Sequence, residues 1–366
     1  MGTKKLLATT ALVAVASTTA HAEGIERFNL STSFMFEEGT YVEAFYGQVT
    51  PDLPATDGVG GFAGVSDQDV GEDFDVFGAS FKMDVSERFS VGVTFNNQLA
   101  GADIEWDPLP IAADVQITGL TLMGKYQVNE NISLLGGIKR AELKESTLEV
   151  PLVGAETWES SGGDDGYGYV IGAAYEIKDI ALRAVLTYES EIQIDPDLES
   201  VNGGGGADGQ ADLSIGDVWN LSFQTGVAQN TLAFANIRYS KWDDNQGFVP
   251  TDPFVVGVSQ AQVTDFGDGY SYTIGVAQRL SDQWVLSASY FHDPGDGELA
   301  SPLSPVGATN SITLGARYTL PQGTNISFGY THSKRGDATV DLGDAGIGTV
   351  EGSTVKSVGI RVGHSF

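Results

Sequence analysis

The sequence contains no cysteine, only four histidines and few basic residues, and each shortage removes a class of function. Without cysteine there is no disulfide, no thiolate nucleophile and no cysteine-bound zinc or iron–sulfur cluster, which suits a chain that crosses an oxidising compartment. The 49 acidic residues outnumber the 19 basic ones and give a net charge of −30, which repels a phosphate backbone. We therefore expect no nucleic-acid partner.

Long apolar segments are also missing. Beyond the N-terminus, no stretch reaches 18 uninterrupted apolar residues, so a membrane-embedded form of this chain would have to cross the bilayer as strands. The N-terminus has Lys4 and Lys5 before an apolar run over 6–16, and then a small-x-small pattern that ends at Ala22. This pattern predicts a signal peptide over 1–22, because the run is too short for a membrane helix.

The sequence is rich in glycine, in aromatic residues and in apolar and polar residues that alternate with a period of two. In residues 311–320, for example, Ile312 lies on an apolar face and Thr313 on a polar one, and the same design returns at 324–335 and 353–366. A soluble β-sandwich alternates too, but its exposed face is usually richer in long charged side chains. The small polar residues here favour a crowded lumen, with the apolar face turned toward lipid.

The alternation predicts an all-β fold, a transmembrane antiparallel β-barrel of about fourteen strands, in the outer membrane of a Gram-negative bacterium. The strands are expected near 40–50, 73–84, 88–98, 112–128, 131–145, 165–178, 180–194, 211–227, 230–243, 268–280, 283–293, 308–320, 324–335 and 353–366. Short turns alternate with long segments, as they do between the periplasmic and outer ends of such barrels. The long segments are 51–72, 99–111, 146–164, 195–210, 244–267, 294–307 and 336–352.

Aromatic residues concentrate near the expected strand ends, where their amphipathic rings favour the level of the lipid headgroups. Toward the long segments they are Trp106, Tyr167, Tyr188, Trp219, Tyr239, Trp242, Tyr270 and Tyr290, and toward the short turns Phe89, Tyr126, Tyr175, Trp284 and Phe366. We expect two aromatic girdles, although cross-strand pairs in an ordinary sheet would give similar rows.

Six basic residues fall on or near the polar faces of the expected strands. They are Lys125, Lys139, Arg183, Arg238, Arg317 and Arg361. In a lumen they could attract a carboxylate head group as ligand-binding residues, or they could pair with lumen acids such as Glu176 and Glu189. The sequence leaves both interpretations open.

Other candidate sites have weaker patterns. The loop acids are paired carboxylates without EF-hand spacing, so we expect no bound metal and interpret them as solvated loops, with divalent ions shared with lipopolysaccharide as an alternative. The pairs are Asp164 with Asp165, Asp195 with Asp197, Asp243 with Asp244, and Asp293 with Asp296. The glycines at 203–206 lack the strand-to-helix context of a phosphate site, and we expect no cofactor. His292 beside Asp293 and His332 beside Ser333 give no triad geometry, so we predict no catalytic residue and no enzyme.

The mature N-terminus resembles the opening of FadL/TodX-type outer-membrane transporters of hydrophobic compounds. The resemblance rests on Gly24, Ile25, Glu26 and Arg27, on Phe36, Glu37, Glu38, Gly39, Thr40, Tyr41, Val42 and Glu43, on Pro51, and on the terminal Phe366. It implies a plug segment over 23–39 and a barrel over 40–366. It also implies that long-chain fatty acids or aromatic hydrocarbons enter from the outer loops and leave sideways through the wall.

Two features depart from the family pattern. The plug is short and has no Asn-Pro-Ala motif, and the loops over 146–164 and 195–210 are short and polar. The sequence therefore does not decide whether this chain has the family's hydrophobic capture groove. Apolar residues of the plug could line a ligand pocket or act as a stopper: Ile25, Phe28, Leu30, Phe34, Met35 and Phe36.

The function implied is passive diffusion of hydrophobic small molecules through a plugged barrel. The alternative is a general diffusion porin or a structural barrel with acidic loops. The expected partners are the hydrophobic substrate, the lipids and lipopolysaccharide of the outer membrane, and the barrel-assembly machinery through Phe366.

Overall fold

The computed structural model describes residues 24–56, 68–107, 109–151, 154–202, 204–295, 300–342 and 345–366. The signal peptide predicted over 1–22 lies outside the described residues. Within these ranges, no helix has the length and apolar character needed to cross a membrane.

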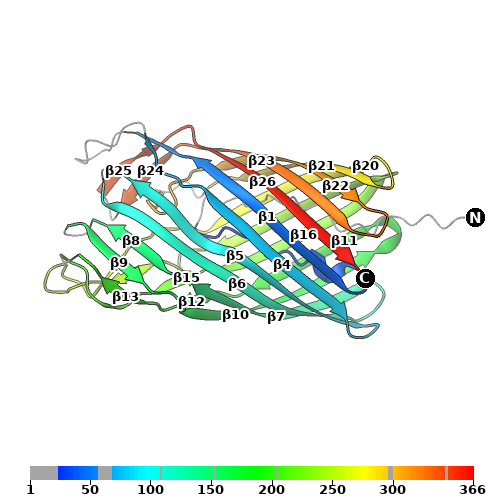
Figure 1. Ribbon diagram of the computed structural model, residues 1–366, viewed down its shortest axis with the longest axis horizontal. Coiled ribbons are helices and arrows are strands. Elements are labelled where there is room, and N and C mark those ends of the chain that lie inside the picture. The colour runs from blue at the N-terminus through cyan, green and yellow to red at the C-terminus, as the bar shows by residue number, and fades with distance from the viewer. Residues whose placement is uncertain are drawn as a thin grey trace, which may run out of the picture.

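The main body is a closed antiparallel barrel of fourteen strands (Figure 1). In order around the wall they are β1 (Tyr41–Asp52), β4 (Phe74–Asp84), β5 (Phe89–Trp106), β6 (Ile111–Gln127), β7 (Ile132–Leu143), β10 (Asp165–Ile177), β11 (Leu182–Glu189), β16 (Asp217–Ala228), β17 (Thr231–Lys241), β20 (Gly269–Arg279), β21 (Trp284–Asp293), β22 (Thr309–Thr319), β23 (Asn325–Arg335) and β26 (Thr354–Ser365). Strand β26 pairs with both β23 and β1, which closes the wall and removes the sheet edges that lipid could not hydrogen-bond. The predicted fold class and strand number are confirmed.

Shorter elements gather mainly at one end of the barrel. The strands are β2 (Pro54–Thr56), β3 (Gln68–Asp69), β8 (Ser146–Val150), β9 (Glu156–Ser160), β12 (Ile192–Ile194), β13 (Asp197–Ser200), β14 (Gly209–Gln210), β15 (Leu213–Ile215), β18 (Phe248–Pro250), β19 (Gln260–Gln262), β24 (Ala338–Leu342) and β25 (Ala345–Val350), and the 3-10 helices are η1 (Ser33–Phe36) and η2 (Lys178–Ile180). The loop hairpins with β8, β9, β13, β24 and β25 lie opposite the end that holds the C-terminus (Figure 1). Because these barrels have short turns on the periplasmic side and longer loops outside, the end with the loop hairpins is the outer end.

The two faces of the wall differ as the alternation predicts. Ile312 and Leu314 of β22 are 58% and 54% exposed on the outside of the wall, whereas Thr313 between them is 7% exposed. Inside, Thr313 bonds to Thr331 at 2.8 Å, and Ser311 bonds to Ser333 at 2.7 Å. Since the exposed apolar side chains would meet water in a soluble protein, this belt is the surface that lipid covers.

Three expected strand boundaries were wrong, and one of them is the start of the strand expected over 211–227, which begins at Asp217 after the separate β15. Residues 99–111 were expected to form a long loop, but β5 continues to Trp106 and pairs with β6 from Ile111, so the barrel wall extends upward here. The strand expected over 180–194 ends at Glu189, and the chain turns inward as β12, which pairs with β15. The isoleucines of β12 and β15 are buried in an apolar cluster beneath the loops. The inward turn is favourable because it removes these side chains from water.

Two aromatic residues were also misplaced in the expected outer girdle. Trp106 and Trp242 are at most 1% exposed. The indole Nε1 of Trp106 donates to the carbonyl of Pro302 at 3.1 Å, and Trp242 packs edge-on against Phe266. Tyr167 is 63% exposed, as a girdle residue should be.

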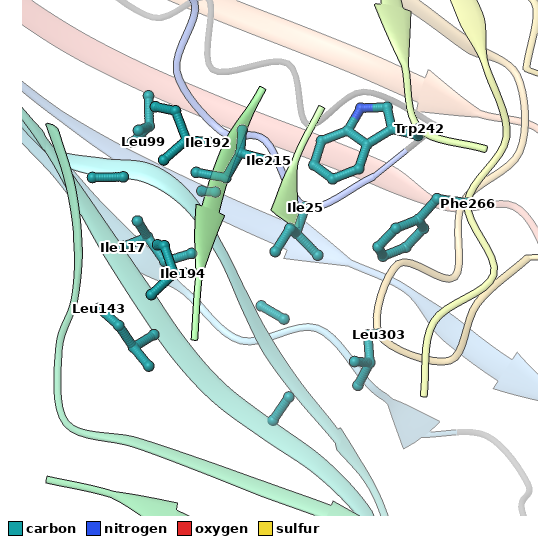
Figure 2. Packing of buried hydrophobic residues seen from close by; sticks show 14 residues of the cluster. Ile25, Leu99, Ile117, Leu143, Ile192, Ile194, Ile215, Trp242, Phe266 and Leu303 are labelled. Carbon is teal, nitrogen blue, oxygen red and sulfur yellow. The ribbon is translucent and has the colours of Figure 1, made fainter. Parts of the chain in front are cut away.

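The largest apolar cluster lies beneath the loops at the outer end (Figure 2). Figure 2 labels Ile25, Leu99, Ile117, Leu143, Ile192, Ile194, Ile215, Trp242, Phe266 and Leu303, which come from the N-terminal segment, the wall and the folded-in loops. Thus the loops are packed elements that cap the lumen.

Candidate functional site

The N-terminal segment, residues 24–39, runs inside the barrel. Near its start, the backbone N–H of Arg27 donates to the carbonyl of Leu99 at 3.0 Å, and the N–H of Gly101 donates to the carbonyl of Ile25 at 2.8 Å. Near its end, Lys82 Nζ donates to the carbonyls of Glu37 and Gly39 at 2.7 and 2.9 Å. These bonds anchor the segment to the lumen face at both ends.

Buried ion pairs hold the same segment. Glu26 pairs with Arg238 of β17, and both side chains are almost fully buried. Arg27 pairs with Asp103 of β5, and its guanidinium lies 4.0 Å from the ring centroid of Phe74. Burial lowers the pKa of Arg27, and the Asp103 carboxylate opposes this shift. A charge left alone in such a place is expensive, so these pairs fix the register of the segment.

Helix η1 packs close against β5 because a glycine leaves room for it. A Cβ at Gly92 would come within 2.5 Å of Met35 Sδ and 2.6 Å of Phe34 Cε2. Phe34 and Met35 are therefore buried against the wall, in a cluster that includes Met123 and Leu135.

A cavity of about 190 Å³ lies in the lumen beside the N-terminal segment. The apolar residues lining it are Phe28, Leu30, Phe36, Phe45, Val76, Val185, Phe223, Phe234, Ala235 and Phe291, and the polar ones are Asn29, Ser31, Thr32, Ser33, Arg183, Asn220, Ser222, Gln224, Asn236, Ser271, Thr273, Ser289, Thr313 and Arg361. The rings of Phe28 and Phe45 stack with centroids 5.2 Å apart. We call this space the central cavity.

The polar side of the central cavity is largely neutral. Asn236 Nδ2 donates to Asn220 Oδ1 at 2.8 Å and to Ser222 Oγ at 3.1 Å, so these side chains satisfy one another. The two basic residues that line it are already paired: Arg183 Nε donates to Glu176 at 2.9 Å, and Arg361 lies 3.7 Å from Glu43.

The other predicted lumen cations are engaged as well. Lys139 pairs with Glu189, Arg238 pairs with Glu26, and Lys125 lies 4.6 Å above the ring of Phe36. Arg317 Nε donates weakly to Ser327 Oγ at 3.4 Å. The pairing predicted for the lumen acids Glu176 and Glu189 is thus present.

Glu37, at the end of the N-terminal segment, is a carboxyl with an unusual environment. Burial raises its pKa to about 7, while the cations Arg317, Arg183 and Lys82 oppose that shift and Glu43 adds to it. The Glu37 carboxyl therefore changes its protonation state near neutral pH.

A second, apolar cavity of about 80 Å³ lies under the outer loops. Its lining includes Leu148 and Trp158 from the 146–164 loop, Leu198, and Val249 and Val263. The sequence does not decide whether a capture groove exists, because these loops are polar in composition. In the structure Leu148, Trp158 and Leu198 line the cavity, whereas Val201 is 55% exposed. The hairpins make this possible by sending alternate side chains to opposite faces.

The wall has a break between β4 and β5. Their pairing stops at Gly78 and Asn96, and beyond this point Asn97 bridges the strands by accepting from the N–H of Phe77 at 2.6 Å. Three residues of β5, 97–99, stand opposite one residue of β6, which is a large bulge. In and above the bulge, backbone groups of β5 bond to the N-terminal segment and to the 69–72 segment in place of β4.

The sequence-predicted ligand residues therefore divide into two groups. The central cavity is lined by Phe28, Leu30, Phe36, Arg183 and Arg361. Those outside it are Ile25, Phe34, Met35, Lys125, Lys139, Arg238 and Arg317. Sequence reasoning missed the neutral polar residues of β16, β17 and β20, although their inward parity was the available signal.

The comparisons with known proteins agree with this architecture. The family model described as outer membrane protein transport protein (OMPP1/FadL/TodX) matches residues 66–360. The chain belongs to this family. The resemblance and the outer-membrane location predicted from the sequence are confirmed, and the OMPP1/FadL/TodX family consists of transporters of hydrophobic compounds.

Relatives of the OMPP1/FadL/TodX family share the fold at low identity. The long-chain fatty acid transport protein of Salmonella typhi is 23% identical over 74% of this chain and 66% of its own length. The crystal structure of a Pseudomonas aeruginosa FadL homologue is similar with a TM-score of 0.74 at 15% identity over 93% of both chains. The Pseudomonas putida toluene transporter TodX is similar at 0.64 and 13% identity, over 90% of this chain and 91% of that one.

Proposed function

We propose that this barrel passes hydrophobic small molecules across the outer membrane by passive diffusion, and that residues 24–39 act as its plug. The observation that carries the proposal is the central cavity, in which Phe28, Leu30 and Phe36 of the plug face a polar wall. Transfer of an apolar molecule from water to the apolar surface of these three residues is favourable, and no other driving force is needed for it to enter.

The path we propose has three parts. A molecule enters through the apolar cavity under the outer loops, rests in the central cavity and leaves sideways at the break between β4 and β5. A cavity of about 60 Å³ lined by Arg27, Gly71 and Phe74 lies against that break, which supports this exit. The 24–27 stretch must move aside for the exit to open.

The size of the central cavity favours compact substrates. A dry cavity of about 150 Å³ accommodates benzene, so about 190 Å³ fits a single aromatic ring with small substituents. A long-chain fatty acid would need further space toward the loops. Among the relatives, TodX is a toluene transporter and the Salmonella typhi protein a long-chain fatty acid transport protein.

The test is uptake by cells with and without the gene, measured with radiolabelled toluene and with a long-chain fatty acid. We expect the deletion to slow toluene uptake most. Unchanged uptake of both compounds would contradict the proposal. Large stable conductance of the purified protein in planar bilayers, with leakage of small sugars, would support a general diffusion porin instead.

The role of the C-terminus stays a prediction. Phe366 is 78% exposed at the short-turn end, where the assembly machinery could reach it.

A further inference from the structure

The outer border of the lipid-facing belt changes character over β21, β22, β23 and β26. On these strands the outward apolar residues end at Tyr290, Ile312, Tyr330 and Val358, which are 42% to 58% exposed. The next outward positions toward the long loops are polar or basic. They are His292, Asn310, His332, Lys334 and Lys356. We call these five residues the basic patch.

The register brings three members of the basic patch together. His332 stands directly opposite Lys356, and Lys334 follows two residues along on the same face of β23. Diagonal neighbours in a sheet lie roughly 7–8 Å apart, within reach of two flexible lysine side chains aimed at one group. Both lysines are exposed, and among the described residues neither has an ion-pair partner.

A histidine completes the cluster. Nδ1 of His332 is buried and has no hydrogen-bond partner among the described residues. The ring itself is partly exposed on the outer face of β23, opposite Lys356, so a ligand over the strand pair would meet its exposed edge and leave the buried nitrogen out of reach.

The same border is acidic around other parts of the wall. Outward acids stand there on five other strands or at their ends: Asp75, Asp114, Asp165, Asp217 and Asp268. Two outward cations at that level, Arg140 and Lys241, are paired with Asp165 and Asp244. At the edge of the basic patch, Asp52 stands opposite Thr354. In a chain of net charge −30, free lysines confined to one sector form a local exception.

We propose that the basic patch binds the phosphorylated head group of an outer-leaflet glycolipid. The patch lies directly above the apolar belt, so the acyl chains of such a lipid would cover Ile312, Tyr330 and Val358 while its phosphate meets the two ammonium groups. Cations near a membrane surface attract anionic head groups by this mechanism, and the lysines act as point charges for phosphate. This site is separate from the lumen and does not depend on the proposed transport function.

The experiment is a titration of the purified full mature protein with diphosphoryl lipid A, read by native mass spectrometry in the presence of EDTA. The variant is Lys334→Gln with Lys356→Gln. The matched control is Arg88→Gln with Lys178→Gln, which removes two exposed cations at the short-turn end. Lys334→Arg with Lys356→Arg retains the charge. Heat-modifiable migration on gels checks that each variant folds.

We expect the double glutamine variant to bind at least about tenfold more weakly, while the control and the arginine variant bind like the wild type. Dephosphorylated lipid A should bind weakly to all four proteins, and glucosamine phosphate without acyl chains should not compete. Equal binding by the glutamine variant and the wild type would overturn the proposal. So would loss of wild-type binding in EDTA, which would place the lipid on metal-bridged loop acids, or effective competition by glucosamine phosphate, which would indicate a site for free phosphate.

Discussion

At the scale of single residues, the position of the plug depends on charges that the barrel wall neutralises. Glu26 and Arg238 are 212 residues apart in the chain and nevertheless meet as a buried pair. The sequence showed Arg238 as an inward cation and left its partner open between substrate and acid. Only the path of the N-terminal segment decides this, because no local pattern encodes so distant a contact.

Removing one member of this pair should loosen the plug. We expect Glu26→Gln to destabilise the packed segment by about 3–5 kcal/mol, because Arg238 is left buried without its counter-charge. The measurement is limited proteolysis of the N-terminal segment, followed by mass spectrometry. As a control, the double variant Glu26→Gln, Arg238→Met should recover most of the protection. Equal protection in the wild type and the single variant would contradict the account.

The raised pKa of Glu37 should make stability depend on pH. Its pKa is about 7 in the folded barrel and 4.5 in the unfolded chain, so the folded state binds more protons between these values. The stability of the barrel should therefore fall as pH rises from about 4.5 to about 7. Urea unfolding midpoints of the refolded protein measure this effect. In Glu37→Gln that slope should be smaller, and an unchanged slope would show that other groups cause it.

At the scale of elements, alternation predicted the wall strands well and missed their irregular ends. Strands such as β22 were predicted within a residue or two, since one face meets lipid and the other the lumen along their whole length. The inward turn after Glu189 and the bulge in β5 were not predicted. Both depend on what packs beside them, the capped lumen in one case and the plug in the other.

The bulge in β5 should be necessary for lateral exit. Deleting Gln98 and Leu99 leaves one residue of β5 opposite Thr118 of β6, so the ladder can run on without a break. We expect the variant to fold, as judged by heat-modifiable migration, but to take up hydrophobic compounds at the level of a strain without the gene. Deletion of Val128 and Asn129 in a short turn is the matched control for chain length. Normal uptake by the bulge deletion would place the exit elsewhere.

At the scale of the whole molecule, the polar side chains of the wall face the lumen and the apolar ones face the membrane. The overall composition predicted this division, because the small polar faces were too poor in charge for a soluble sandwich. It did not predict the central cavity. The size of that space is set by the distance between the plug and the polar residues of β16, β17 and β20, which is a property of the assembled barrel.

The central claim, that hydrophobic molecules pass through the central cavity, is tested most directly by filling it. Ser271 lines the cavity, and in Ser271→Phe the added ring occupies the space that toluene would fill. Placing toluene beside it would overpack the cavity at a cost of about 1–3 kcal/mol, so toluene uptake should fall about tenfold. Ala288→Phe adds the same ring to the lipid-facing side of β21 and should leave uptake unchanged. Uptake of radiolabelled toluene by cells that contain equal amounts of each folded barrel is the measurement. Equal uptake by the two variants would contradict passage through the central cavity.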